Sequence, residues 1–250
     1  MADVPATVLA DLNAGHIETR TLVEMFAMDL GVLLDHVAPG LGPRLETRAG
    51  ADAGITRRMA AAADVLLEAK GPAIIDTLAA HPSDMARGWG AYAVGALDDL
   101  DLPARLARIR PFAADPHFGV REWAWLGVRA RIAADVDRAI ALLEPWTGEA
   151  RDTLRRFAVE STRPRGVWCR HIAALKADPG RGLPVLAPLR ADPSPYVQDS
   201  VANWLNDAAR GDPAWVRALC ASWLGGVGDD AVDPATRRIC RRAQRSLKDA

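Results

Sequence analysis

The chain has 250 residues, of which half are hydrophobic and a quarter are charged, with a formal net charge of −1. This composition is typical of a soluble globular protein, and no apolar run approaches the roughly 18 residues that a membrane-spanning helix needs. The three cysteines lie far apart, which argues against a disulfide framework or a zinc site and favours a reducing compartment. Since the N-terminus also lacks the features of a signal peptide, we expect a cytoplasmic protein.

The first 70 residues predict an N-terminal helical cap. Residues 6–37 predict two helices with a break at 13–15, residues 39–54 predict a Gly/Pro-rich mobile loop, and residues 55–70 predict another helix. Strand signals are weak throughout, because alternating β-branched runs are missing and Ala, Leu and Arg dominate.

An internal repeat is the main signal after residue 70. Residues 82–89 match 116–123 at an offset of 34, residues 154–158 match 120–124 at the same offset, and the next step is 43 residues. Second helices are expected at 102–110, 136–143 and 182–189, and a flexible loop at 225–230. A period of about 34–45 residues with two helices per unit is typical of HEAT repeats. We predict an all-α fold, a right-handed α-solenoid of HEAT-like helix pairs, with residues 71–250 as one continuous domain and a concave binding face.

The charge differs between the two parts of the chain. Residues 1–100 carry 7 Lys/Arg against 14 Asp/Glu, and residues 101–250 carry 24 against 18. A basic C-terminal part suggests a surface that faces a polyanion, although chance asymmetry on a solvated surface explains it equally well. Arginine makes up 28 of the 31 basic residues; it binds phosphate with two parallel hydrogen bonds, but a GC-rich coding bias gives the same excess.

Polar residues at helical spacing recur in three neighbouring repeats, where equivalent helices of a solenoid line one face. The stripes are Glu122, Trp125 and Arg129; Arg156, Glu160 and Arg163; and Asp199, Asn203 and Asn206. Each stripe directs one carboxylate to what we interpret as a common surface. Ordinary solvated faces with i, i+4 ion pairs, such as Arg156–Glu160, explain the same pattern.

Tryptophan is unusually frequent, with eight copies. Trp125 shares the stripe of Glu122, and Trp168 lies in the basic stretch 163–171. Arginine and tryptophan on one face suit a polyanion with an aromatic or cationic ligand, whereas core packing is the alternative for each tryptophan. The common metalloprotease, nucleotide and hydrolase motifs are missing, and the five histidines are scattered, so we expect no metal site and no cofactor.

Three segments resemble the HEAT-like alkylpurine DNA glycosylases of the AlkC/AlkD type, most closely AlkC. They are HFGVREWAW at 117–125, ESTRPRGVWC at 160–169 and YVQDSVANWLND at 196–207, and residues 12–22 are similar too. The resemblance covers about residues 9–223. It implies base excision repair of 3-methyladenine, related N3-alkylated lesions and 3-methylcytosine in double-stranded DNA, without extrusion of the damaged base.

The resemblance also implies roles for individual residues. Glu122, Glu160 and Asp199 would be the catalytic carboxylates, and the expected lesion and DNA contacts are Trp125, Trp168, Arg163, Arg165, Arg156, Asn203, Asn206 and His117. An alkylated cationic base is already a good leaving group, so the enzyme needs negative charge beside the sugar rather than a general acid. We therefore expect a monomeric, monofunctional bacterial glycosylase that associates with the nucleoid when bound to DNA.

Two other interpretations remain open. A non-catalytic HEAT module that binds DNA or protein has the same repeat period and charge, but has no reason to keep three carboxylates on one face. A metal-dependent hydrolase is less favoured, because no histidine joins the three stripes.

Overall fold

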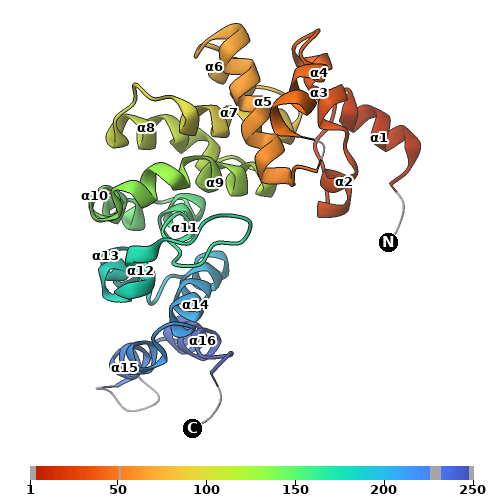
Figure 1. Ribbon diagram of the computed structural model, residues 1–250. Coiled ribbons are helices and arrows are strands. Elements are labelled where there is room, and N and C mark those ends of the chain that lie inside the picture. Colours follow the sequence, from red (N-terminus) through yellow and green to blue (C-terminus); the bar gives the residue numbers. More distant parts are fainter. Residues whose placement is uncertain (1–3, 51, 226–231, 248–250) are drawn as a thin grey trace. The chain divides into compact units, whose positions relative to one another are not determined.

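The computed structural model describes residues 4–50, 52–225 and 232–247 (Figure 1). Within these ranges every regular element is a helix, which confirms the prediction of an all-α fold. The chain forms two compact units, Met1–Val128 and Arg129–Ala250. Their boundary lies inside the helix α9, and not near residue 70, where the sequence predicts the end of a cap. The cap does not separate there because α5 and α6 pack on α7.

Unit 1 is built from nine helices in its described residues, the last of which continues into unit 2. They are α1 (Ala6–Asn13), α2 (Leu22–Ala27), α3 (Leu30–Val37), α4 (Gly42–Ala49), α5 (Ile55–Lys70), α6 (Ile74–Ala79), α7 (Asp84–Ala96), α8 (Leu102–Ala113) and α9 (Phe118–Ala134).

The first helices of unit 1 correct two predictions from the sequence. Residues 6–37 hold three helices instead of two, because Thr21 caps α2 and Asp29 caps α3 through side-chain hydrogen bonds to backbone N–H groups. The predicted mobile loop at 39–54 contains α4, whose Leu45 is fully buried although the segment is rich in glycine and proline. The predicted helix at 55–70 is confirmed as α5.

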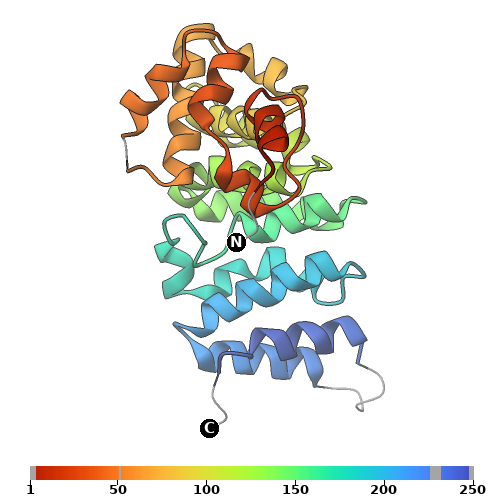
Figure 2. The same cartoon turned by 90° about the vertical axis from the view of Figure 1, so that its right-hand side faces the viewer.

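Unit 2 is also helical (Figure 2). Its described residues include three short 3-10 helices. Its further elements are α10 (Val136–Leu143), η1 (Glu144–Gly148), α11 (Asp152–Glu160), α12 (Ala173–Ala177), η2 (Pro179–Gly182), α13 (Leu183–Leu186), η3 (Ala187–Leu189), α14 (Pro195–Ala209), α15 (Pro213–Leu224) and α16 (Pro234–Ala243). The helix predicted at 182–189 is thus split between α13 and η3. The predicted loop at 225–230 lies outside the described residues except for Gly225.

The repeat period is visible as a recurring polar side chain. Arg87, Arg121 and Arg155, each 34 residues apart, donate through one guanidinium nitrogen to the two carbonyl oxygens six and five residues earlier, at 2.7 to 3.1 Å. Gln198, 43 residues after Arg155, donates to the carbonyl of Asp192, again six residues earlier. These bonds satisfy backbone oxygens that the turn before each first helix leaves without a partner, which confirms the predicted offsets of 34, 34 and 43.

Two of these arginines also link one repeat to the next within each unit. Arg87 forms a two-point ion pair with Asp115, and Arg155 forms the same pair with Asp192. The two aspartates accept backbone N–H groups two residues later, from His117 and from Ser194. Each pair is largely buried, so it fixes the start of the next repeat on the preceding one.

Candidate nucleic-acid interface

Glu160 is a buried carboxylate at the end of α11, with only 2% of its surface exposed. The Ser200 hydroxyl donates to one of its oxygens at 2.6 Å and Arg163 donates to the other at 3.1 Å, while Arg156 lies 3.6 Å away. Burial raises the pKa of Glu160, but the charges of Arg156 and Arg163 and the two hydrogen bonds outweigh it, so the pKa is lowered. Glu160 therefore stays anionic at neutral pH in a site that excludes water.

Two arginines hold Glu160 and are themselves fixed. Arg163 also pairs with Asp207 at 2.7 Å, and Arg156 lies over the Tyr196 ring with its guanidinium carbon 4.4 Å from the ring centre. The predicted stripe of Arg156, Glu160 and Arg163 is therefore a connected cluster, but it is mostly buried rather than solvated. A fixed cluster of this kind presents a preorganised charge, which a solvated pair does not.

A loop of residues 161–172 follows Glu160 and is organised by Arg129. The guanidinium of Arg129 donates to the carbonyl oxygens of Ser161, Arg163 and Arg170. Arg129 is 3% exposed, so its expected place on a solvent-facing stripe is corrected: it is a buried organiser of backbone carbonyls. The Ile172 N–H closes the loop on the carbonyl of Pro164 at 3.1 Å.

The tip of this loop exposes two apolar side chains. Val167 is 56% and Trp168 is 51% exposed, although both are residue types that folding usually buries. Trp168 has a φ of +60°, a left-handed conformation that is strained for a residue with a side chain. Gly166 allows the turn, because a Cβ at this position would lie 2.1 Å from the Cys169 sulfur. The loop thus holds an aromatic ring outward at a conformational cost.

Asp199 lies on α14, next to Ser200, and is partly exposed. One of its oxygens pairs with both Arg238 and Arg242 of α16, at 2.7 and 3.0 Å. Asn203, one turn further along α14, accepts a hydrogen bond from Arg245 at 2.9 Å. Asp199 therefore lies beside arginines of α16, and Asn203 lies beside an arginine that follows this helix.

Asn206 has a structural role instead of the predicted DNA contact. It is 3% exposed, and its amide donates to the Ala243 carbonyl and to the Ser246 hydroxyl at 2.9 and 2.7 Å. These bonds tie α14 to the end of α16, and they leave the amide no surface to offer to a ligand.

Glu122 and Trp125 lie on the part of α9 that belongs to unit 1. The Trp125 indole N–H donates to a Glu122 oxygen at 2.9 Å; Glu122 is partly exposed and Trp125 is 3% exposed. Trp125 therefore orients the carboxylate, and its predicted direct contact with the lesion is corrected to that role. Glu122 belongs to unit 1, whereas Glu160 and Asp199 belong to unit 2. The common surface predicted for the three carboxylates therefore stays a prediction.

His117 is also removed from the expected DNA contacts. Its ring is 9% exposed, its Nε2 lies 2.6 Å from the Thr19 carbonyl, and its Nδ1 accepts the Gly119 N–H at 3.1 Å. With both ring nitrogens engaged, His117 fixes the first turn of α9 rather than a ligand.

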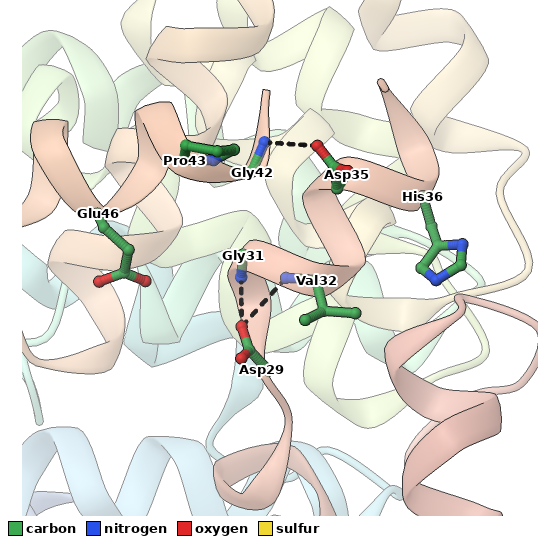
Figure 3. A pocket seen from close by; sticks show the side chains of 8 residues that line it. All are labelled: Asp29, Gly31, Val32, Asp35, His36, Gly42, Pro43 and Glu46. Carbon is green, nitrogen blue, oxygen red and sulfur yellow. Dashed lines mark hydrogen bonds between the residues drawn. The ribbon is translucent and has the colours of Figure 1, made fainter. Parts of the chain in front are cut away.

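A cavity of about 520 Å³ in unit 1 has none of the predicted site residues in its lining (Figure 3). Its lining includes Asp29, Asp35 and Glu46. Asp29 and Asp35 accept backbone N–H groups, and Glu46 pairs with Arg58. Since these carboxylates would repel phosphate and already stabilise local structure, this cavity does not suit DNA.

Solved structures that are similar to this chain include two DNA-repair proteins, AlkC and AlkD2. A structure of Pseudomonas fluorescens alkylpurine DNA glycosylase AlkC, bound to DNA containing an abasic site analog, aligns with 98% of this chain at a TM-score of 0.69 and 24% identity. AlkD2 from Streptococcus mutans aligns with 83% of this chain at a TM-score of 0.62 and 20% identity. This chain has the fold of AlkC and AlkD2. The predicted resemblance to the AlkC/AlkD type is thereby confirmed for the fold.

The chain spans less than two thirds of the AlkC chain and about a third of the curated relative that it matches. It covers 65% of the AlkC chain and 97% of the AlkD2 chain. A 120-residue segment is 38% identical to the uncharacterized protein YhaZ of Bacillus subtilis (strain 168), which corresponds to 48% of this chain and 32% of YhaZ. No family model matches the sequence.

Several residues of the candidate site escape prediction from the sequence. Ser200 and Asp207 complete the cluster of Glu160 and Arg163, and Arg238 and Arg242 complete the pair with Asp199. Helical spacing gave a partial signal for Ser200, which neighbours Asp199. It gave none for the α16 arginines, because none of the three predicted stripes extends beyond Asn206.

Two findings concern metals and membranes. Across residues 4–50, 52–225 and 232–247, no three side chains of His, Cys, Asp or Glu gather in a way that could hold a metal ion. Within the same ranges, no helix combines the length and the apolar character that crossing a bilayer requires.

Proposed function

We propose that this protein is a DNA repair glycosylase that hydrolyses the N-glycosidic bond of cationic N3-alkylated bases, 3-methyladenine and 3-methylcytosine, in duplex DNA. The observation that carries the proposal is Glu160, a buried carboxylate kept anionic by Arg156, Arg163 and Ser200 in a chain with the AlkC fold. The proposed enzyme is a monofunctional hydrolase that works as a monomer in the cytoplasm, without a cofactor.

The reaction suits such a carboxylate. Alkylation leaves a positive charge on the base, so the N-glycosidic bond can break with its electron pair moving onto the base, which departs neutral. The sugar then gains positive charge, and water adds to C1′ while a carboxylate takes its proton. A preorganised anion in a site without water stabilises the charge on the sugar more than a solvated carboxylate does.

The three carboxylates have different surroundings, which suggests different roles. Glu160 is buried and held by two arginines, so we assign it to electrostatic stabilisation. Glu122 and Asp199 are partly exposed, so they are the candidates for contact with water or the sugar. Trp125 orients Glu122 through its indole N–H.

DNA contacts are proposed for the loop 161–172 and its neighbours. Trp168 offers an exposed ring that can stack on a base or attract a cationic one. Arg165 has a buried Nε without a hydrogen-bond partner among the described residues, so a backbone phosphate would satisfy it. Arg156 and Arg163 contact Glu160, and we assign them to positioning that carboxylate. Asn203, which is partly exposed beside Arg245, stays a proposed DNA contact.

Base release from methylated duplex DNA, measured with EDTA present, tests the proposal. We expect release of free 3-methyladenine by the wild-type protein. Glu122→Gln and Asp199→Asn should each slow release strongly without a large change in melting temperature. Glu68→Gln and Asp137→Asn, which remove carboxylates from exposed ion pairs outside the site, are the matched controls.

The other outcomes separate the alternatives. Binding to DNA without base release would favour a non-catalytic binding module. Neither release nor binding would favour a protein scaffold, and release that EDTA abolishes would point to a metal-dependent hydrolase.

A further inference from the structure

Helix α14 presents a polar stripe to the Glu160 cluster of α11, and the two helices pack against each other (Figure 1). The members of the stripe are four and seven residues apart, so they lie on one face of α14; they are Tyr196, Ser200 and Asp207. Each member contacts one member of the cluster, in the same order along the chain: Tyr196 contacts Arg156, Ser200 contacts Glu160 and Asp207 contacts Arg163. The last two contacts are a hydrogen bond and an ion pair, whereas the contact of Tyr196 is of a different kind.

Tyr196 contacts Arg156 through the face of its ring. The guanidinium carbon of Arg156 lies over the ring, 4.4 Å from its centre. The same guanidinium lies 3.6 Å from Glu160, so the ring and the carboxylate contact one group. The Arg156 side chain is only 12% exposed, and a cation–π contact is stronger where water is excluded. The ring therefore contributes to holding the guanidinium in place.

The Arg156–Glu160 pair is weak without a contact from outside its own helix. The arginine precedes the glutamate by four residues, which is the less favourable order for an i, i+4 pair on a helix. Fixing an arginine side chain also costs the freedom of several rotatable bonds. The Tyr196 ring comes from another helix and restricts the guanidinium before any ligand binds.

An aromatic ring holds a cation without neutralising it, and this distinguishes Tyr196 from Asp207. The ring attracts the guanidinium through its quadrupole and carries no net charge. A carboxylate in the place of Tyr196 would share the charge of Arg156 and would add a like charge near Glu160. Burial raises the pKa of Glu160, and the charge of Arg156 is the largest of the effects that lower it. A neutral ring leaves the charge of Arg156 to act on Glu160.

We propose that Tyr196 is a positioning residue of the candidate site, whose ring holds the Arg156 guanidinium against Glu160. Tyr196 acts through Arg156, and we assign it no contact with DNA or with the reacting atoms. The consequence for the reaction rests on the proposed function, in which Glu160 stabilises the charge on the sugar. Because the ring holds the guanidinium in the free protein, it should affect the rate of the chemical step more than the affinity for DNA.

The Nε–H proton of Arg156, followed by NMR in the free protein, tests the contact itself. In the wild type we expect slow exchange of this proton with water and a ring-current shift. Tyr196→Phe keeps the ring and should keep both features, whereas Tyr196→Leu should lose them. The same Arg156 signal in all three proteins would overturn the proposal. This measurement needs no substrate, so absence of base release by the wild type would refute the proposed function while the Arg156 signal would still decide the contact.

Single-turnover base release at saturating DNA tests the consequence for catalysis. Tyr196→Leu should slow release about 5- to 20-fold, as expected for the loss of one desolvated cation–π contact, with a Kd for DNA within about threefold of wild type. Tyr196→Phe should keep a rate near that of wild type. A wild-type rate in Tyr196→Leu, equally slow release by Tyr196→Phe, or a loss confined to the Kd would each overturn the positioning role.

The pH dependence of release separates positioning from a loss of stability. If Arg156 moves away, the pKa of Glu160 rises, so the acid limb of the rate profile should shift to higher pH in Tyr196→Leu and stay in place in Tyr196→Phe. Tyr92→Leu is the matched control, because it also removes a partly exposed tyrosine ring, which contacts the Trp123 ring in unit 1. It should lower the melting temperature without changing the rate or the acid limb. An acid limb that stays in place in Tyr196→Leu, or shifts equally in Tyr92→Leu, would overturn the proposal and leave Tyr196 a packing residue.

Discussion

Replacing Glu160 with glutamine removes one negative charge and keeps nearly the same shape. In the wild type, both oxygens of Glu160 have partners and the side chain is almost fully buried. The variant leaves Arg156 and Arg163 facing a neutral amide. We expect slower base release and a lower melting temperature. The magnitude of each effect can be estimated separately from the contacts of Glu160.

The stability loss follows from breaking a buried ion pair, which costs about 3–5 kcal/mol. Arg163 keeps Asp207 at 2.7 Å and Arg156 keeps the Tyr196 ring, so the lower end, about 3 kcal/mol, is expected. For a chain of this size that corresponds to a fall in melting temperature of roughly 6–12 °C. The rate of base release should fall on the order of 10²- to 10³-fold, as for the loss of one preorganised electrostatic contact.

Asp192→Asn is the matched control, because it also breaks a buried ion pair in unit 2. Asp192 is 5% exposed and pairs with Arg155 at 2.6 and 3.0 Å, on the repeat-linking contact rather than in the proposed site. Single-turnover base release, measured well below both melting temperatures, should be normal in Asp192→Asn and slow in Glu160→Gln. Equal rates in the two variants would refute the catalytic reasoning, whatever the melting temperatures.

Three further predictions concern the same region. Folding lowers the pKa of Glu160 from its usual 4.5, so its contribution to stability is full above about pH 4.5 and is lost as the pH falls below that value. Thermal melts should show wild type losing more stability than Glu160→Gln as the pH falls below about 4.5. Trp168→Gly should bind DNA more weakly in a titration with little change in melting temperature, because the lost ring is exposed and glycine relieves the positive φ; unchanged affinity would contradict its role. Gly166→Ala should lower the melting temperature by forcing Cys169 aside, at a cost of about 1–3 kcal/mol, whereas Gly148→Ala, with open space around it, should not.

The repeat could be predicted from the sequence because every repeat has carbonyl groups before its first helix that need a hydrogen-bond donor. Arg87, Arg121 and Arg155 each satisfy the carbonyls of the preceding turn, so the residue type and the spacing return together. The N-terminal helices could not be placed as well. There α4 is stabilised by burial of Leu45 against neighbouring helices, a tertiary effect that overrides a local excess of glycine and proline.

Helical spacing identified side chains on one face, but not what covers that face. Arg129 and Asn206 have the spacing of surface residues, yet the loop 161–172 covers the first and the end of α16 covers the second. Glu160 also has the spacing of a surface residue and is also buried. Its burial with two arginines gives a fixed anion in place of a surface ion pair, and this favours a functional role for the side chain.

The steps between Arg87, Arg121 and Arg155 are 34 residues, whereas the step to Gln198 is 43. The longer step contains the loop 161–172, while Arg155 still reaches Asp192 at the start of the following helix. The scaffold contact is therefore indifferent to how much chain lies between its two ends. The tip of the loop can therefore be redesigned without changing the contact between repeats, provided that the carbonyl contacts with Arg129 and the place of Arg163 in the Glu160 cluster are kept.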